Sequence, residues 1–214
     1  QPGVYTVTLT ARNQAGLTAS TSWLQAVHAA PAAGGGVLIN EVVAGAWRGA
    51  KDENGDAEDW VELYNSSASA VDLSGWGLSN KTNSPFRWVF PAGTTIAAKG
   101  HLRVWMSQKD RTASATNLHT NFNVDNGADD VVLTAPDGTA TGVRIDQTTP
   151  ALTTPDESWC RAVNGSPTAA FVHCAAPTPG AANSGTTTGP STPVQVNGSM
   201  RHRPFSGPPS GHPD

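Results

Sequence analysis

The stretch Asp59-Trp60-Val61-Glu62-Leu63-Tyr64 runs into the turn formers Asn65-Ser66-Ser67, which predicts a strand that ends in a turn. Upstream, residues 37–43 (VLINEVV) predict a second strand, and the acidic segment 51–59 predicts the loop that joins the two. Further short strands are predicted downstream. They fall within 71–78, 88–90, 101–105, 131–133 and 143–146, the last two flanking the hairpin turn signal Asp137-Gly138. No long segment shows a helical period, so the pattern favours an all-β sandwich or barrel.

The amino-acid composition disfavours two classes of protein, nucleic-acid binders and proteins with a membrane span. The 214 residues carry 13 basic and 17 acidic side chains, a formal net charge of −4. Nucleic-acid binders usually present a clustered basic face, so this class is disfavoured. No run of about 18 apolar residues occurs, and we therefore expect no membrane span. Only 14% of the residues are charged, and 22 Gly and 16 Pro supply many turns, as in a β-rich protein.

Four segments are predicted along the chain. Residues 1–28 hold an alternating strand (Tyr5, Val7 and Leu9 on one side) and a second, weaker strand; two strands alone are marginal in water. We therefore expect an orphan hairpin, the end of a truncated domain. Residues 29–36 form a linker, 37–183 a main domain, and 184–214 a disordered tail rich in Gly, Pro, Ser and Thr. The chain begins at Gln1 without a signal peptide, which suggests a processed product or a fragment.

Several blocks resemble the lamin tail domain. They are Leu38–Glu41, Asp59–Asn65, Val71–Ser79, Phe90–Thr94, Leu118–Phe122 and Pro177–Asn183. The resemblance covers 37–183 and implies an immunoglobulin-like β-sandwich without an active site. It looks like the bacterial, secreted branch of the family, and residues 2–16 resemble the end of a PKD-like domain. Nuclear lamins contact DNA, but residues 37–183 hold ten basic and 16 acidic residues, a net charge of −6, so we do not expect this here.

The resemblance also assigns roles to side chains. We expect Trp60, Trp76 and Trp88 to fill the sandwich, and His119, in its Leu-His-Thr-Asn-Phe block, to be part of the fold. No nucleophile elbow, P-loop or HExxH motif occurs, and nothing ties a Ser, a His and an Asp together. No catalytic or cofactor-binding residue is predicted, and the chain is not expected to be an enzyme.

The two cysteines, Cys160 and Cys174, predict a disulfide, because an even number in an extracellular-looking chain usually pairs. We expect them on neighbouring strands or on the two legs of a loop. A zinc site made by Cys160, His173 and Cys174 is the alternative, but it lacks a fourth ligand of suitable spacing.

One segment could bind a metal. Asp52, Asn54, Asp56 and Glu58 alternate as hard oxygen ligands, with Asp59 next to them, and Ca²⁺ takes about six to eight such oxygens. The frame departs from an EF-hand, because Gly55 and Leu63 stand at the wrong positions. The alternative is a solvated acidic turn. A structural calcium ion is thus the one cofactor considered.

These observations predict a monomeric, non-catalytic extracellular module of a larger secreted multidomain protein, which spaces other domains or binds an unidentified protein or polysaccharide. Two alternatives stay open. The chain could be the accessory domain of a secreted hydrolase, nuclease or CotH-type kinase whose catalytic part lies elsewhere, or a nucleic-acid-binding module, which the net charge disfavours.

Overall fold

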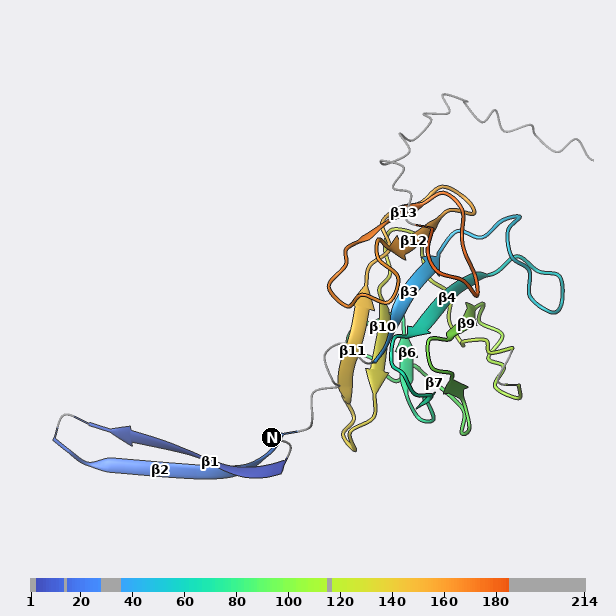
Figure 1. Ribbon diagram of the computed structural model, residues 1–214. Coiled ribbons are helices and arrows are strands. Elements are labelled where there is room, and N and C mark those ends of the chain that lie inside the picture. Colours follow the sequence, from blue (N-terminus) through green and yellow to red (C-terminus); the bar gives the residue numbers. More distant parts are fainter. Residues whose placement is uncertain (1–2, 14, 28–35, 115–116, 185–214) are drawn as a thin grey trace, which may run out of the picture.

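A computed structural model describes residues 3–13, 15–27, 36–114 and 117–184. The predicted linker 29–36 and tail 184–214 lie almost wholly outside these residues. The described part contains strands and no helix (Figure 1). The strands are β1 (Gly3–Arg12), β2 (Thr18–Val27), β3 (Val37–Val43), β4 (Asp59–Asn65), β5 (Val71–Asp72), β6 (Gly77–Ser79), β7 (Trp88–Val89), β8 (Thr95–Ile96), β9 (His101–Met106), β10 (Val131–Ala135), β11 (Val143–Thr148), β12 (Ser158–Arg161) and β13 (Phe171–Cys174).

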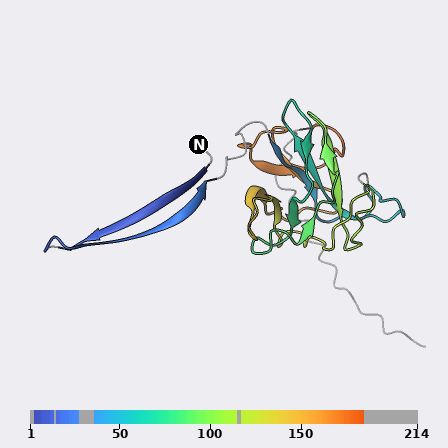
Figure 2. The same ribbon diagram turned by 90° about the horizontal axis from the view of Figure 1, so that it is seen from below.

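Two antiparallel sheets form the main body. One has five strands in the order β13-β12-β3-β4-β9, and the other has four in the order β11-β10-β6-β7. A short pair, β5-β8, is separate from both. Figure 2 shows the same sheets from below. The prediction of an all-β, immunoglobulin-like β-sandwich is confirmed.

The core follows from alternation along each strand. Val61 and Leu63 of β4 point into the main apolar cluster with Ile39 of β3 and Leu133 of β10. Side chains between them along β4, such as Glu62, therefore lie on the outer face of the five-stranded sheet. Trp88 belongs to the main cluster, as expected.

The expectation that Trp60 fills the sandwich is wrong. Trp60 is buried, but it packs with Val43 and Trp105 in a second cluster. The register places Trp60 opposite both Val43 and Trp105, on three neighbouring strands. Since Val61 faces the core, Trp60 must face away from it. Of the other two tryptophans, Trp76 is partly buried and packs against the main cluster.

The last two strands complete the five-stranded sheet. β12 pairs with β3 and β13 pairs with β12, so residues 158–174 extend the sheet that residues 37–106 begin. Cys160 and Cys174 form the expected disulfide between these neighbouring strands, with Cα atoms 6.0 Å apart and a sequence separation of 14. Closing a loop of this length stabilises a fold by about 3 kcal/mol in the chain-entropy model.

The N-terminal hairpin is a sheet of its own. β1 and β2 pair from Gly3↔Val27 to Arg12↔Thr18, and neither strand joins another sheet within the described residues. Leu9, on the side expected to need a partner sheet, is 61% exposed. That the hairpin is the end of a truncated PKD-like domain stays a prediction.

Candidate functional site

The acidic loop between β3 and β4 is folded around the carboxylate of Asp52. Asp52 Oδ1 accepts hydrogen bonds from the backbone amides of Asn54 and Asp56, at 2.9 and 3.0 Å. Gly55 adopts a positive φ of 84°, which glycine permits at no steric cost. An isolated bridge between Lys51 and Ala57 closes the base of the loop. The loop is thus a compact hairpin rather than an open acidic surface.

Lys109 supplies the positive charge at the centre of this loop. Its Nζ lies 2.5 Å from Asp52 Oδ2, 2.7 Å from Asp56 Oδ2 and 2.9 Å from Glu58 Oε1. Burial opposes ionisation of Asp52, but the hydrogen bonds from Lys109 and from two backbone amides outweigh it and lower the pKa to about 2. The same contacts raise the pKa of Lys109 against the opposing effect of burial. The ammonium group of Lys109 therefore lies among three of the side chains that the sequence predicts as calcium ligands.

The five predicted metal ligands do not converge as a set. The carboxylates of Asp52, Asp56 and Glu58 have oxygens within 4.8 Å of one another. Asn54 instead lies against the guanidinium of Arg111. Asp59 accepts a hydrogen bond from the amide of Ala46 at 3.0 Å, and burial raises its pKa to about 6. Calcium binding stays a prediction, and a calcium ion at these three carboxylates would have to displace Lys109.

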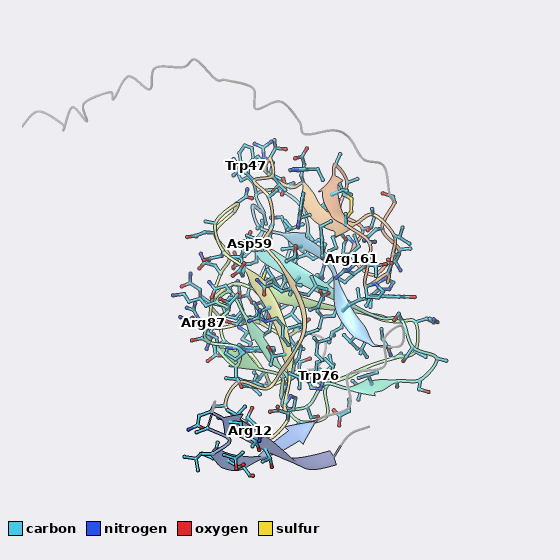
Figure 3. All side chains as sticks on the ribbon, turned by 90° about the vertical axis from the view of Figure 1, so that its left-hand side faces the viewer. Arg12, Trp47, Asp59, Trp76, Arg87 and Arg161 are labelled. Carbon is cyan, nitrogen blue, oxygen red and sulfur yellow. A yellow bond between two sulfur atoms is a disulfide. The ribbon has the colours of Figure 1, made fainter. Side chains whose placement is uncertain are left out.

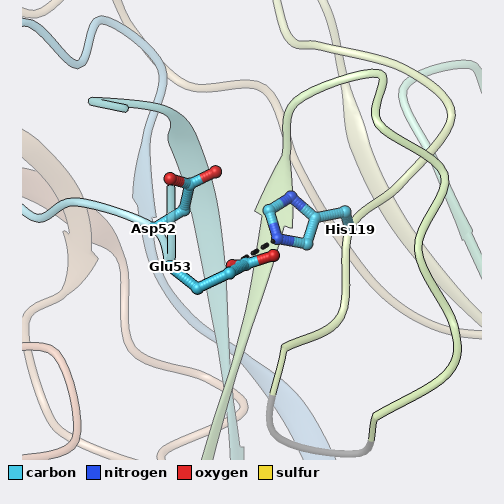
Figure 4. Close-up of side chains that lie close together, drawn as sticks. All are labelled: Asp52, Glu53 and His119. Atoms are coloured by element: carbon cyan, nitrogen blue, oxygen red, sulfur yellow. Dashed lines mark hydrogen bonds and ion pairs between the residues drawn. The ribbon is translucent and has the colours of Figure 1, made fainter. Parts of the chain in front are cut away.

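A chain of hydrogen bonds links a serine and a histidine to Glu53 of this loop. Ser107 Oγ is 2.8 Å from His119 Nδ1, and His119 Nε2 is 3.0 Å from Glu53 Oε2. Figure 4 shows Glu53 and Asp52 beside the imidazole. The sequence showed no link among these residues, because they are 12 to 66 positions apart. Glu53 also pairs with Arg111.

These hydrogen bonds tie loops of the domain together. His119 is 0% exposed, and both ring nitrogens are engaged within the protein. Its ring also stacks on Trp105, with centroids 6.3 Å apart. A general base must reach the proton that it removes from a substrate or nucleophile. A fully enclosed imidazole packed on a tryptophan fits the expectation that His119 is part of the fold.

Two buried carboxylates hold the end of the domain against its first strands. Glu41 accepts hydrogen bonds from Ser158 Oγ at 2.6 Å and from the amide of Thr178 at 3.0 Å. Glu62, its cross-strand neighbour, accepts from the amide of Gly180 at 2.5 Å. Both glutamates are at most 1% exposed. Residues 177–183, which we name the closing segment, therefore cover the outer face of the five-stranded sheet at this point.

Three asparagines reinforce the same contact. Asn183 Nδ2 donates to the backbone oxygens of Asn40 and Arg161, at 3.0 and 2.9 Å. Asn40 Nδ2 donates in turn to Asn164 Oδ1 at 2.9 Å and to Asn183 Oδ1 at 3.1 Å. The blocks Leu38–Glu41 and Pro177–Asn183, which carried the family resemblance, thus contact each other.

Glu62 is the less well satisfied of the two glutamates. Burial and, to a smaller extent, the neighbouring Glu41 raise its pKa, while Gly180 and Arg103 lower it, and the net result is a pKa of about 7. Its Oε1 has no hydrogen-bond partner and faces His101 Nε2 at 3.8 Å, itself unpartnered. Burial lowers the pKa of His101, so this ring favours its neutral form. Glu62 therefore holds a proton mainly below about pH 7.

An exposed tryptophan stands on a rigid loop at the edge of the sandwich. The carboxylate of Asp156 accepts from the amides of Trp47, Arg48 and Gly49, at 2.8, 3.0 and 2.9 Å. Asp156 itself has a positive φ of 65°, which is uncommon outside glycine. Trp47 is nevertheless 62% exposed, with the Arg48 guanidinium 4.3 Å from its ring centroid. Figure 3 shows Trp47 at one end of the molecule.

We predict that Glu62→Gln stabilises the protein at about pH 8 and flattens its stability between about pH 5 and 8. The pKa of Glu62 is 4.5 in the unfolded state and about 7 in the folded state. The raised pKa therefore contributes to the stability of the fold in full below about pH 4.5, and this contribution is lost as the pH rises through about 7. The gain is at most about 3 kcal/mol. Urea unfolding across this pH range measures it. Equal pH dependence of wild type and variant would contradict the buried, protonated Glu62.

We predict that Lys109→Met increases the affinity for Ca²⁺ by about tenfold or more, because the variant keeps three convergent carboxylates without their ammonium partner. Calorimetric titration of Ca²⁺ into both proteins checks this, with Lys99→Met, a lysine outside the loop, as the matched control. Binding that is equally weak in all three proteins would show that the carboxylates alone do not form a site.

Comparison with known proteins identifies the family. The family model for the Lamin Tail Domain matches residues 30–150, more than half of the chain, and spans β3 to β11. No curated protein and no solved structure gives a significant match. Within the described residues, no helix is long and hydrophobic enough to cross a membrane. On its sequence match and its fold, this chain belongs to the lamin tail domain family.

Proposed function

We propose that this chain is a non-catalytic binding module that works outside the cell, as part of a larger secreted protein of bacterial type. Membership of a family of non-catalytic, immunoglobulin-like domains supports the role of a non-catalytic module. The Cys160–Cys174 disulfide supports a location outside the cell, because such bonds persist mainly in oxidising compartments. The N-terminal hairpin, with the PKD-like pattern of its sequence, supports attachment to a preceding domain.

The observation that carries the binding role is the Trp47 loop. Large aromatic side chains contribute much of the free energy of binding at interfaces, particularly when they are held in place before the partner arrives. Three amide hydrogen bonds to Asp156 fix the backbone that carries Trp47, yet the indole remains 62% exposed. Three hydrogen bonds therefore position a side chain that contributes little to the core.

A polysaccharide is the partner that this surface fits best. The flat indole offers an apolar platform on which a sugar ring can stack, and Arg48 beside it can donate hydrogen bonds to sugar hydroxyls or acidic groups. The neighbouring acidic loop keeps the surroundings polar, with Asp52 and Asp56 both paired to Lys109.

We predict that Trp47→Ala reduces retention on an insoluble polysaccharide by about tenfold or more, without lowering the melting temperature. Cellulose, chitin and peptidoglycan serve as probes in a pull-down assay. Leu152→Ala is the matched control, because Leu152 is also exposed, at 69%, and apolar. Absence of retention on every probe, or equal retention by both variants, would contradict polysaccharide binding through Trp47.

A further inference from the structure

The loop between β6 and β7 folds back over the outer face of the four-stranded sheet. The ring of Phe86 lies so close to Gly77 and Gly142 that no side chain fits at either position. A Cβ on Gly77 would lie 2.7 Å from Phe86 Cδ1, and one on Gly142 would lie 2.6 Å from Phe86 Cζ. The two glycines thus let Phe86 seat directly on the backbone of β6 and of the β10–β11 connection. The loop has a fixed position on the sheet.

Two adjoining hollows lie on either side of this loop. The first, about 410 Å³, is lined by residues that include Lys81, Phe86 and Arg87. The second, about 300 Å³, is lined by residues that include Thr134 and Arg144. Asn83 and Pro85 belong to both. Both hollows are open to solvent, so a ligand there would lie on the surface of the sheet rather than in an enclosed cavity. We name the two together the β6–β7 groove.

The β6–β7 groove is positively charged in an acidic protein. Lys81, Arg87 and Arg144 line it, and none of them forms an ion pair with another residue in the described part of the chain. Among the described residues, the guanidinium of Arg144 donates to the backbone oxygen of Thr82, at 3.4 Å. Arg87 contacts the amide oxygen of Asn80 and the ring of Phe122. By contrast, Lys109, Arg111 and Arg161 are all paired with carboxylates.

A buried hydroxyl group lines the same groove. Thr134 is 0% exposed, and its Oγ1 has no hydrogen-bond partner. An unsatisfied buried polar group costs about 1–3 kcal/mol, but because Thr134 is fully enclosed, a ligand oxygen would reach its hydroxyl only if the covering side chains moved. Asn83 and Thr141 add polar groups at the rim, while Pro85 and Phe86 add apolar surface.

We propose that the β6–β7 groove binds an acidic sugar unit of a carbohydrate chain. The carboxylate pairs with Lys81 and Arg144, the apolar face of the sugar ring packs on Pro85 and Phe86, and its hydroxyls bond to Asn83 and Thr141. This site is distinct from the Trp47 loop, since Figure 3 shows Arg87 on the side of the molecule and Trp47 at its end. Its failure or success therefore does not depend on binding through Trp47.

Trigalacturonic acid, its methyl ester and inorganic phosphate are the three probes, titrated by calorimetry into the intact chain at low salt. We expect the acid to bind and the neutral ester to bind at least about tenfold more weakly, because a charge-assisted hydrogen bond is lost. Affinity for the acid should also fall as salt is added. Equal affinity for acid and ester would overturn the role of the cations. Phosphate binding as tightly as the acid would overturn the role of the sugar ring.

Lys81→Gln is the decisive variant, since Lys81 is exposed and its ammonium has no partner among the described residues. We expect it to lower affinity for trigalacturonic acid by about tenfold at unchanged melting temperature. Arg144→Gln should act in the same direction. Lys99→Gln, which removes one charge elsewhere, is the matched control. The proposal would be overturned if Lys81→Gln and Arg144→Gln bound the acid as tightly as Lys99→Gln does. It would also be overturned if the wild type did not bind the acid.

Discussion

Glu41 and Glu62 are buried side by side on the outer face of the five-stranded sheet, and the closing of the domain depends on them. Two carboxylates enclosed in protein are costly unless hydrogen bonds replace the water that they lose. Glu41 receives that replacement from Ser158 and from Thr178, and Glu62 from the amide of Gly180. The closing segment is thus bound to the first two strands of the sandwich by groups that cannot be left unpaired.

This constraint explains why the domain continues past the end of the family match at residue 150. β12 and β13 complete the sheet, the disulfide joins them, and the closing segment returns to β3 and β4. Breaking the contact would leave Glu41 facing only Ser158. The arrangement is stabilised most when Glu62 carries a proton, because Gly180 then satisfies one oxygen while the other needs no cation.

The acidic loop solves a related problem in another way. Asp52 is also buried, but Lys109 and two backbone amides keep it ionised. Enclosed carboxyl groups are thus stabilised in two ways, by hydroxyl and amide donors beneath the closing segment and by an ammonium group in the loop. Along the β6–β7 groove, Lys81, Arg87 and Arg144 have no carboxylate partner among the described residues, which is why we propose an acidic ligand there.

Sequence patterns predicted the strands well, because apolar residues and turn formers alternate at short intervals from Val37 to Asp146. The face of a strand was harder to predict. Trp60 was predicted to lie in the core of the sandwich. Its neighbours Val61 and Leu63 face that core, so Trp60 lies on the opposite face of the sheet and packs against Trp105. The pairing of Cys160 and Cys174 was predicted, but the sequence left open whether they lie on neighbouring strands, as they do in β12 and β13, or on the two legs of a loop.

Contacts between distant loops could not be predicted at all. Lys109 lies 57 positions from Asp52, and no local pattern links an isolated lysine to a given carboxylate. The same holds for Ser107, His119 and Glu53, and for the acceptance of three amides by Asp156. Such contacts depend on how the sheets bring loops together, which the sequence pattern of any one loop does not contain.

Amide hydrogen exchange of Thr178 and Gly180 tests the central claim most directly. If their amides bind the buried carboxylates of Glu41 and Glu62, they exchange as slowly as amides in β3 and β4, although they belong to no strand. Exchange at the rate of an exposed loop would contradict this, because the closing segment would then not be held on β3 and β4 by these hydrogen bonds.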